Sequence, residues 1–240
     1  MAVGHEYFDP SSIADLDEPV RRYLTHAISP GAPLAPGIRL RMRGRIKVGR
    51  WLAFTAEWEG DGRSFTWSAR AGLGRFAPLR VVDRYRPDAT ACMDVRLLGR
   101  IPLVHADDEG TVRSGAGRAA VEAANWAPVA LLPRHGVRWR AESADHIVAS
   151  WELPPERPEV HLRIHADGSL RSTWVDRWDD GRHGNRGYVP CGGDVHAERR
   201  FDHVTLASLV TVGWWFGTPR YAPFFEAEIL AAEAVFGRGE

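Results

Sequence analysis

The sequence predicts a mainly β, α+β fold in which one large antiparallel sheet curls into a barrel or half-barrel. Apolar and polar residues alternate with period two in many short segments, the pattern of strands with one buried face. Turn residues separate these segments. Only a few stretches have helical character, and no linker or repeat divides the chain. We therefore expect a single domain over residues 1–240.

The N-terminal part is expected to be a helix over residues 18–28. Asp17 can cap this helix, and Pro19 is tolerated in its first turn. Three prolines between residues 30 and 36 then end the helix and lead into the sheet.

The first two strands are expected over residues 38–48 and 52–59, which put apolar side chains on one face and charged ones on the other. The register that keeps the apolar faces together pairs Val48 with Leu52, Ile46 with Phe54, Met42 with Trp58, Arg43 with Glu57 and Arg41 with Glu59. The row of arginines is therefore interpreted as a solvated face with cross-strand ion pairs, and not as a surface for nucleic acid.

A third strand is expected after Asp61-Gly62, a signal for a two-residue hairpin turn. This turn pairs Trp58 with Phe65, Ala56 with Trp67 and Phe54 with Ala69. Further alternating stretches predict strands over residues 79–86, 90–98, 147–153, 159–166 and 170–178.

The stretch 118–133 is expected to plug the sheet. Its helix should end near Trp126 because Pro128 cannot lie deep in a helix, and residues 127–133 should be extended. Whether Arg118 and Glu122, one turn apart, face the interior or the solvent stays open. Residues 222–236 fit either a helix or a closing strand.

Composition excludes several classes of protein. Lys plus Arg and Asp plus Glu both number 31, so no net charge favours nucleic acid. No run reaches the length of a membrane span, and the N-terminus lacks the apolar segment of a signal peptide, so we expect a cytoplasmic protein. Cys92 and Cys191 are expected to be free thiols. No metal or nucleotide motif is present, so no cofactor is expected.

Six stretches in their order resemble a bacterial family of unknown function: EPVRRYL, RLRMRGRIKV, FTAEW, DVRLLGRIPLV, WAPVALLP and GYVPCGG followed by RRFDHV. That family is thought to look like the lipoprotein carriers LolA and LolB and like VioE of violacein biosynthesis. The resemblance implies a curved antiparallel half-barrel with helices plugging its mouth and an apolar cavity inside. It does not supply an activity, because one scaffold hosts several functions.

Three carboxylates are candidate acids or bases. Alternation places Asp83 and Asp176 on inward faces, Asp176 between two tryptophans, and Glu122 lies on the central helix. Burying a bare charge is costly, so each such carboxylate either pairs with an arginine or keeps its proton. His161 and His165 share a strand face with Arg163, which favours solvated histidines over a metal site.

The candidate ligand-binding residues are the aromatic and apolar side chains of the shared face together with the polar end of the central helix. They are Met42, Phe54, Trp58, Phe65, Trp67, Tyr85, Arg118, Asn125, Trp126, Trp174 and Trp178.

Three functions remain open. The first is a soluble binding protein for an apolar or lipid-like small molecule in an aromatic-lined half-barrel cavity. The second is a cofactor-independent cyclase or isomerase of secondary metabolism that uses a buried carboxylate as acid or base. The third is a structural or partner-binding domain without a ligand.

Overall fold

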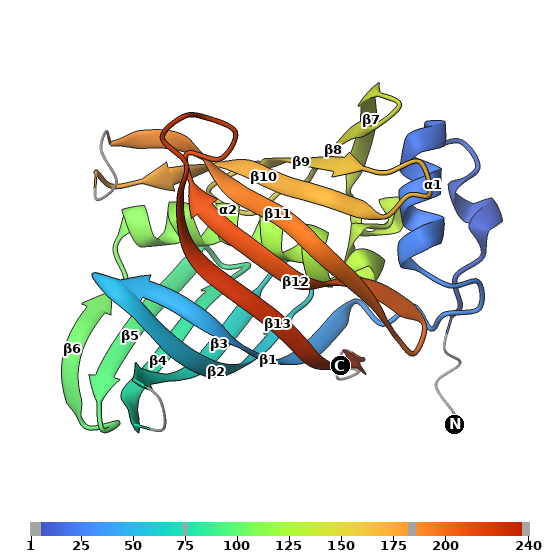
Figure 1. Ribbon diagram of the computed structural model, residues 1–240. Coiled ribbons are helices and arrows are strands. Elements are labelled where there is room, and N and C mark those ends of the chain that lie inside the picture. Colours follow the sequence, from blue (N-terminus) through green and yellow to red (C-terminus); the bar gives the residue numbers. More distant parts are fainter. Residues whose placement is uncertain (1–5, 74–75, 182–185, 237–240) are drawn as a thin grey trace.

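The computed structural model describes residues 6–73, 76–181 and 186–236, and within them one antiparallel sheet of 13 strands wraps around a long helix (Figure 1). The strands follow the order β6-β5-β4-β3-β2-β1-β13-β12-β11-β10-β9-β8-β7. Because β6 and β7 are edge strands, the sheet stays open. The predicted curved half-barrel is confirmed.

The strands are β1 (Gly37–Val48), β2 (Arg50–Gly60), β3 (Phe65–Leu73), β4 (Phe76–Arg86), β5 (Thr90–Leu97), β6 (Ile101–Ala106), β7 (Arg138–Ser143), β8 (His146–Ser150), β9 (Glu159–Ile164), β10 (Leu170–Asp179), β11 (Gly187–Phe201), β12 (Val204–Trp214) and β13 (Ala222–Val235). The helices are α1 (Glu18–Ala27) and α2 (Glu109–Trp126), with short 3₁₀ turns η1 (Pro10–Ile13), η2 (Pro128–Leu131) and η3 (Pro133–His135).

The chain order explains why α2 lies inside the curve. Strands β1 to β6 build one half of the sheet in sequence, and β7 to β13 build the other half. The segment between β6 and β7 must therefore connect the two edges of the sheet. It does so across the concave side as α2, which packs on β10, β5, β4, β12 and β9. In the described residues, no helix combines the length and apolar character needed to cross a membrane.

The predicted registers of the first three strands are wrong by two residues, although the faces are right. Ile46 lies opposite Leu52, and Trp58 lies opposite both Leu40 and Trp67. The first turn is tighter than the three residues expected between the strands. Gly49, with a positive φ of 69°, is the single residue between β1 and β2.

The second turn is longer than the predicted two residues. Residues 61–64 connect β2 to β3, and the Asp61 carboxylate accepts hydrogen bonds from the backbone N–H groups of Arg63 and Ser64. The cross-strand ion pairs move with the registers, so the pairs formed are Arg39 with Glu59, Arg43 with Glu228 and Arg45 with Glu226.

The helix boundaries are partly as predicted. Helix α2 ends at Trp126, but it begins at Glu109, and part of the segment after it is the 3₁₀ turn η2 where an extended segment was expected. Asp17 precedes α1 without capping it; its carboxylate accepts the backbone N–H of Ala141 instead. Residues 222–235 form strand β13, which pairs with β1 on one side and with β12 on the other and so joins the two halves of the open sheet.

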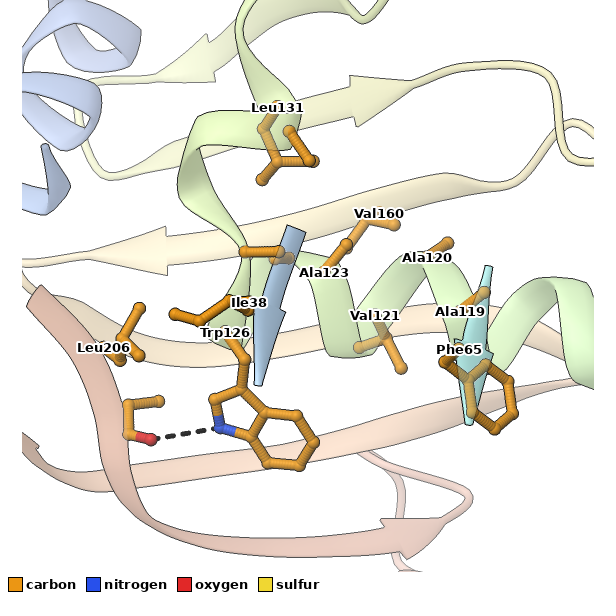
Figure 2. Close-up of a cluster of buried hydrophobic side chains, with 14 of the residues drawn as sticks. Ile38, Phe65, Ala119, Ala120, Val121, Ala123, Trp126, Leu131, Val160 and Leu206 are labelled. Atoms are coloured by element: carbon orange, nitrogen blue, oxygen red, sulfur yellow. Dashed lines mark hydrogen bonds between the residues drawn. The ribbon is translucent and has the colours of Figure 1, made fainter. Parts of the chain in front are cut away.

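The core lies between α2 and the sheet. Met42, Phe54, Trp58, Phe65 and Trp67 are all at most 4% exposed, as their shared face predicted. Figure 2 shows α2 facing this layer, with Ala119 beside Phe65 and Trp126 pointing away from the end of the helix. The interior is therefore largely filled by α2.

Candidate functional site

Arg118 of α2 lies at the centre of a buried network with Asp83, Glu122 and Trp58. Its Nη1 forms an ion pair with Asp83 of β4, and its Nε donates to Glu122 Oε1 at 2.6 Å. Trp58 Nε1 of β2 donates to the other oxygen of Glu122 at 2.6 Å. We call these four residues the Arg118 network. Arg118 and Glu122 thus face the interior, and the inward orientation predicted for Asp83 is confirmed.

The surroundings of Arg118 favour its charged form. Burial lowers the pKa of Arg118, but the charges of Glu122 and Asp83 outweigh this effect and raise the pKa above its ordinary value. The guanidinium also lies over the rings of Phe65 and Trp67, at 4.6 and 5.5 Å from their centroids.

Two glycines of α2 let the helix approach the sheet closely enough for these contacts. A Cβ on Gly115 would lie 3.3 Å from Tyr85 Cδ2, and one on Gly117 would lie 3.2 Å from Arg177 Cγ. The start of the helix is fixed by Asp108, whose carboxylate accepts the backbone N–H of Thr111 at 2.8 Å.

A cavity of about 120 Å³ lies next to the Arg118 network, near the N-terminal half of α2. Its lining includes Asp83, Met93, Ser114, Arg118, Arg177, Trp178 and Trp214. Arg177 Nε donates to the backbone oxygen and the hydroxyl of Ser114 at 2.9 and 3.0 Å. Among the described residues, no hydrogen-bond partner is present for Trp178 Nε1, which is a buried donor. The cavity therefore offers hydrogen-bond donors to an acceptor.

Comparison with known proteins gives a family. The profile of a family of unknown function, DUF6544, matches residues 6–227. The chain belongs to this family. This confirms the resemblance found in the sequence, and no curated protein gives a significant match.

Two solved structures are similar to this member of the DUF6544 family. One is described as an outer membrane lipoprotein-sorting protein domain from Vibrio parahaemolyticus, with 10% identity and a TM-score of 0.46 over 85% of this chain and 87% of that one. The other is a DUF1329 family protein from Desulfovibrio piger, with 10% identity and a TM-score of 0.38 over 85% of this chain and 88% of that one.

The concave face of the DUF6544 chain is not covered everywhere. Its apolar side chains on β4, β5 and β6 point to the same side as buried Asp83 and Tyr85, yet they are only half-buried or exposed. We call this set the open strip: Leu79, Val81, Val95, Leu97 and Val104. The strands pair Leu79 with Leu97 and Val95 with both Val81 and Val104, so the strip is continuous.

Asp176 lies on the outer face of the sheet, so its predicted inward orientation is wrong. A bulge between Leu170 and Ser172, where β10 pairs with β9, shifts the alternation by one residue. Val175 is consequently buried, whereas Asp176 is exposed. Trp174 moves to the outer side with Asp176, and Arg177 points to α2 in its place, whereas Trp178 lines the 120 Å³ cavity near the N-terminal half of α2.

Asn125, Trp126, Tyr85 and Phe54, which were also predicted to bind a ligand, are core residues with partners inside the protein, whereas Trp67 Nε1 is a buried donor without a hydrogen-bond partner among the described residues. Asn125 Nδ2 donates to Thr173 Oγ1 at 2.9 Å, Trp126 Nε1 donates to the Ala207 carbonyl at 3.1 Å (Figure 2), and the Tyr85 hydroxyl donates to the Pro154 carbonyl at 2.6 Å. Burial raises the pKa of Tyr85 to about 12. Phe54 stacks on Phe225 at 5.2 Å between ring centroids. These contacts leave no free polar group on Asn125, Trp126 or Tyr85 for a ligand.

Two other hollows of the described residues lie away from the Arg118 network. A polar hollow of about 730 Å³ includes the paired Arg39 and Glu59 in its lining, and an apolar one of about 150 Å³ lies near Pro128 at the C-terminal end of α2. In the described part of the chain, no group of three or more His, Cys, Asp or Glu side chains is arranged to hold a metal ion.

His161 is half-buried, so its predicted solvated position is wrong. Its ring stacks on Trp174 at 4.9 Å with an interplanar angle of 6°, and its Nδ1 lies 3.0 Å from His146 Nε2. His165 is exposed as expected. Burial is the main cause that lowers the pKa of both His146 and His161 below the ordinary 6.5.

Acidification should destabilise the protein through this histidine pair. Because the pKa values are lower in the folded state, the neutral pair contributes stability above about pH 6.5, and this contribution is lost as the pH falls toward the folded values. The variant His146→Gln/His161→Gln should therefore lose less of its melting temperature than the wild type between about pH 7.5 and about pH 5.5.

His26 provides a control of opposite sign. Its hydrogen bond to Glu198 raises the pKa of His26, so its contribution is present below pH 6.5 and is lost as the pH rises through the folded value. His26→Gln should accordingly cost more at about pH 5.5 than at about pH 8. If the change in melting temperature caused by each variant is the same at every pH, these histidines do not contribute to the pH dependence of stability and the prediction is wrong.

Proposed function

We propose that this protein binds an apolar or lipid-like small molecule on the concave face of the half-barrel, along the open strip. The observation that carries the proposal is that α2 covers only part of the concave face. The remaining inward-facing side chains are aliphatic and accessible, and such surfaces are typical of binding sites.

The open strip leads to a polar end that would orient a ligand. Met93 and Asp83 are cross-strand neighbours on β5 and β4, and both line the 120 Å³ cavity that also contains Arg177 and Trp178. An apolar body could lie on the strip while one acceptor oxygen accepts from these donors. Each methylene group that the strip buries contributes about 0.8 kcal/mol.

The enzyme hypothesis has less support. Asp83 and Glu122 both form ion pairs with Arg118, and Glu122 also accepts a hydrogen bond from Trp58, so both carboxylates already have partners within the protein. Asp176 lies outside the concave face. We therefore propose that Asp83 and Glu122 hold α2 against the sheet and form part of the polar end of the site.

Binding can be tested with the neutral fluorescent probe N-phenyl-1-naphthylamine. We expect saturable binding by the wild type and an affinity about tenfold lower for Val81→Asn, because an amide in contact with an apolar ligand costs about 1–3 kcal/mol. Val82→Asn is the matched control, since Val82 is the next residue of β4 and faces outward.

Two outcomes would count against the proposal. Equal probe affinity of the Val81 and Val82 variants would show that the probe does not use the open strip. Absence of any saturable binding, together with no retained small molecule in native mass spectra of the purified protein, would favour a structural domain. Leu97→Asn is a second strip variant in case Val81→Asn lowers the melting temperature.

A further inference from the structure

The same four-residue sequence pattern, apolar-Gly-Arg-apolar, occurs between β1 and β2, between β3 and β4, and between β5 and β6. The sequences are VGRW, LGRF and LGRI, and they begin at Val48, Leu73 and Leu98, which are 25 residues apart. Gly74 and Arg75 lie outside the described residues. The turn glycines Gly49 and Gly99 have φ values of 69° and 72°, a conformation that favours glycine.

The strand registers place these turns side by side at one end of the half-barrel. Ala53 pairs with Gly72, and Leu98 N donates to the Pro78 carbonyl at 2.7 Å, so each turn adjoins the next hairpin. Strands lie about 4.8 Å apart, which spaces successive hairpins by about 10 Å. In Figure 1 the β1–β2 and β5–β6 hairpins turn toward the left-hand end of the molecule, where β3 also ends and β4 begins.

The described residues of these turns combine exposed apolar side chains with cations. Phe76 is 68% exposed, and Val48 and Leu98 are each 64% exposed, the highest values among the large hydrophobic residues that the structure describes. Lys47, Arg50, Leu73, Arg100 and Ile101 are exposed beside them. No Asp or Glu occurs in residues 47–51, 73–76 or 98–101. We call the described residues of these segments the hairpin rim.

We propose that the hairpin rim docks on a lipid bilayer that contains anionic lipids. Apolar side chains at the tips suit the boundary between headgroups and acyl chains, and adjacent arginines and lysines attract phosphates. The charge of the rim is of one sign and complements an anionic surface. Exposed apolar side chains occur at all three hairpins and described cations at two of them, which suits a partner that is laterally uniform, as a bilayer is and a protein surface is not.

The position of the rim also relates it to the open strip. Leu97 of the strip directly precedes Leu98 of the rim and pairs with Ile101. A molecule leaving a bilayer at the rim would therefore meet the strip first. Docking nevertheless goes beyond ligand binding and does not require it.

Flotation with lipid vesicles tests the proposal on the full chain. Vesicles of phosphatidylcholine with about 30% phosphatidylglycerol should carry the wild type, and those of phosphatidylcholine alone should carry much less. Arg50→Glu/Arg100→Glu should lower the partition coefficient at least about 30-fold, because losing the two arginines alone costs about 1 kcal/mol each at 1.4 kcal/mol per tenfold, and the new carboxylates are repelled in addition. Phe76→Ser/Leu98→Ser should lower it about tenfold or more.

Matched controls separate the rim from the rest of the surface. Arg138→Glu/Arg171→Glu makes the same charge change at exposed positions of β7 and β10, and Leu209→Ser/Leu230→Ser removes exposed leucines of β12 and β13. Both should keep wild-type binding within about twofold. All four variants should bind N-phenyl-1-naphthylamine like the wild type, so a failure of docking is distinguishable from a failure of ligand binding.

Three results would overturn the proposal. The wild type floats with neither vesicle, or the rim variants bind as well as the wild type, or the control variants lose as much binding as the rim variants. If the wild type does not float and light scattering shows a dimer that Phe76→Ser/Leu98→Ser converts to a monomer, the rim is covered by a second copy of the chain instead.

Discussion

Replacing Arg118 with methionine should lower the free energy of unfolding by about 3–5 kcal/mol. The substitution leaves the carboxylates of Asp83 and Glu122 buried without the guanidinium that pairs with both. Their side chains are only 11% and 13% exposed, so water cannot replace the lost partner. Urea denaturation followed by tryptophan fluorescence measures the change.

An exposed ion pair provides the comparison. Arg43 pairs with Glu228 on the outer face, where the side chains are 61% and 39% exposed, and Arg43→Met should cost less than about 1 kcal/mol. The triple variant Asp83→Asn/Arg118→Met/Glu122→Gln should recover most of the stability, because it removes the unpaired charges as well. If Arg118→Met costs no more than Arg43→Met, the Arg118 network is hydrated in solution and the interpretation of the site must change.

The faces of the strands were predictable, but their registers were not. Alternation with period two assigns Met42, Trp58 and Trp67 to the interior, and an error in the strand register leaves this assignment unchanged when it is an even number of residues. The register itself depends on turn length, which is set by details such as the Asp61 carboxylate bonding to the next backbone N–H groups. A shift of two residues therefore changes the ion pairs and leaves the core intact.

The orientation of Asp176 failed for a related reason. A single bulge inverts the alternation along β10, and no turn residue in the sequence marks it. Because of the same bulge, alternation in the sequence assigns Arg177 to the outside, although its side chain reaches Ser114 of α2.

The open strip could not be predicted from the sequence for another reason. The accessibility of its side chains depends on how far α2 extends over the sheet. The hairpin rim carries a sequence signal, the repeated apolar-Gly-Arg-apolar pattern, which a search for longer repeats misses.

Replacing Trp126 with alanine should also lower the free energy of unfolding by about 3–5 kcal/mol. The side chain is 2% exposed, packs edge-on against Trp58 at 5.5 Å and donates to the Ala207 carbonyl. Trp126→Phe should cost less, about 1–3 kcal/mol, because it keeps most of the volume and leaves one carbonyl without its donor. Trp51→Ala, at a half-exposed position of the hairpin rim, is the control and should cost less than about 1 kcal/mol.

The same variant decides whether α2 is a fixed plug or a lid over the binding site. Trp126 anchors the C-terminal end of α2, whereas the 120 Å³ cavity and the open strip adjoin its N-terminal half. If α2 is a fixed part of the core, Trp126→Ala should lower stability while the folded fraction keeps its affinity for N-phenyl-1-naphthylamine. A lid would behave differently, since loosening its anchor would raise the population of the open state and with it the apparent affinity. The continuous packing of α2 on the strands of both halves of the sheet favours the plug.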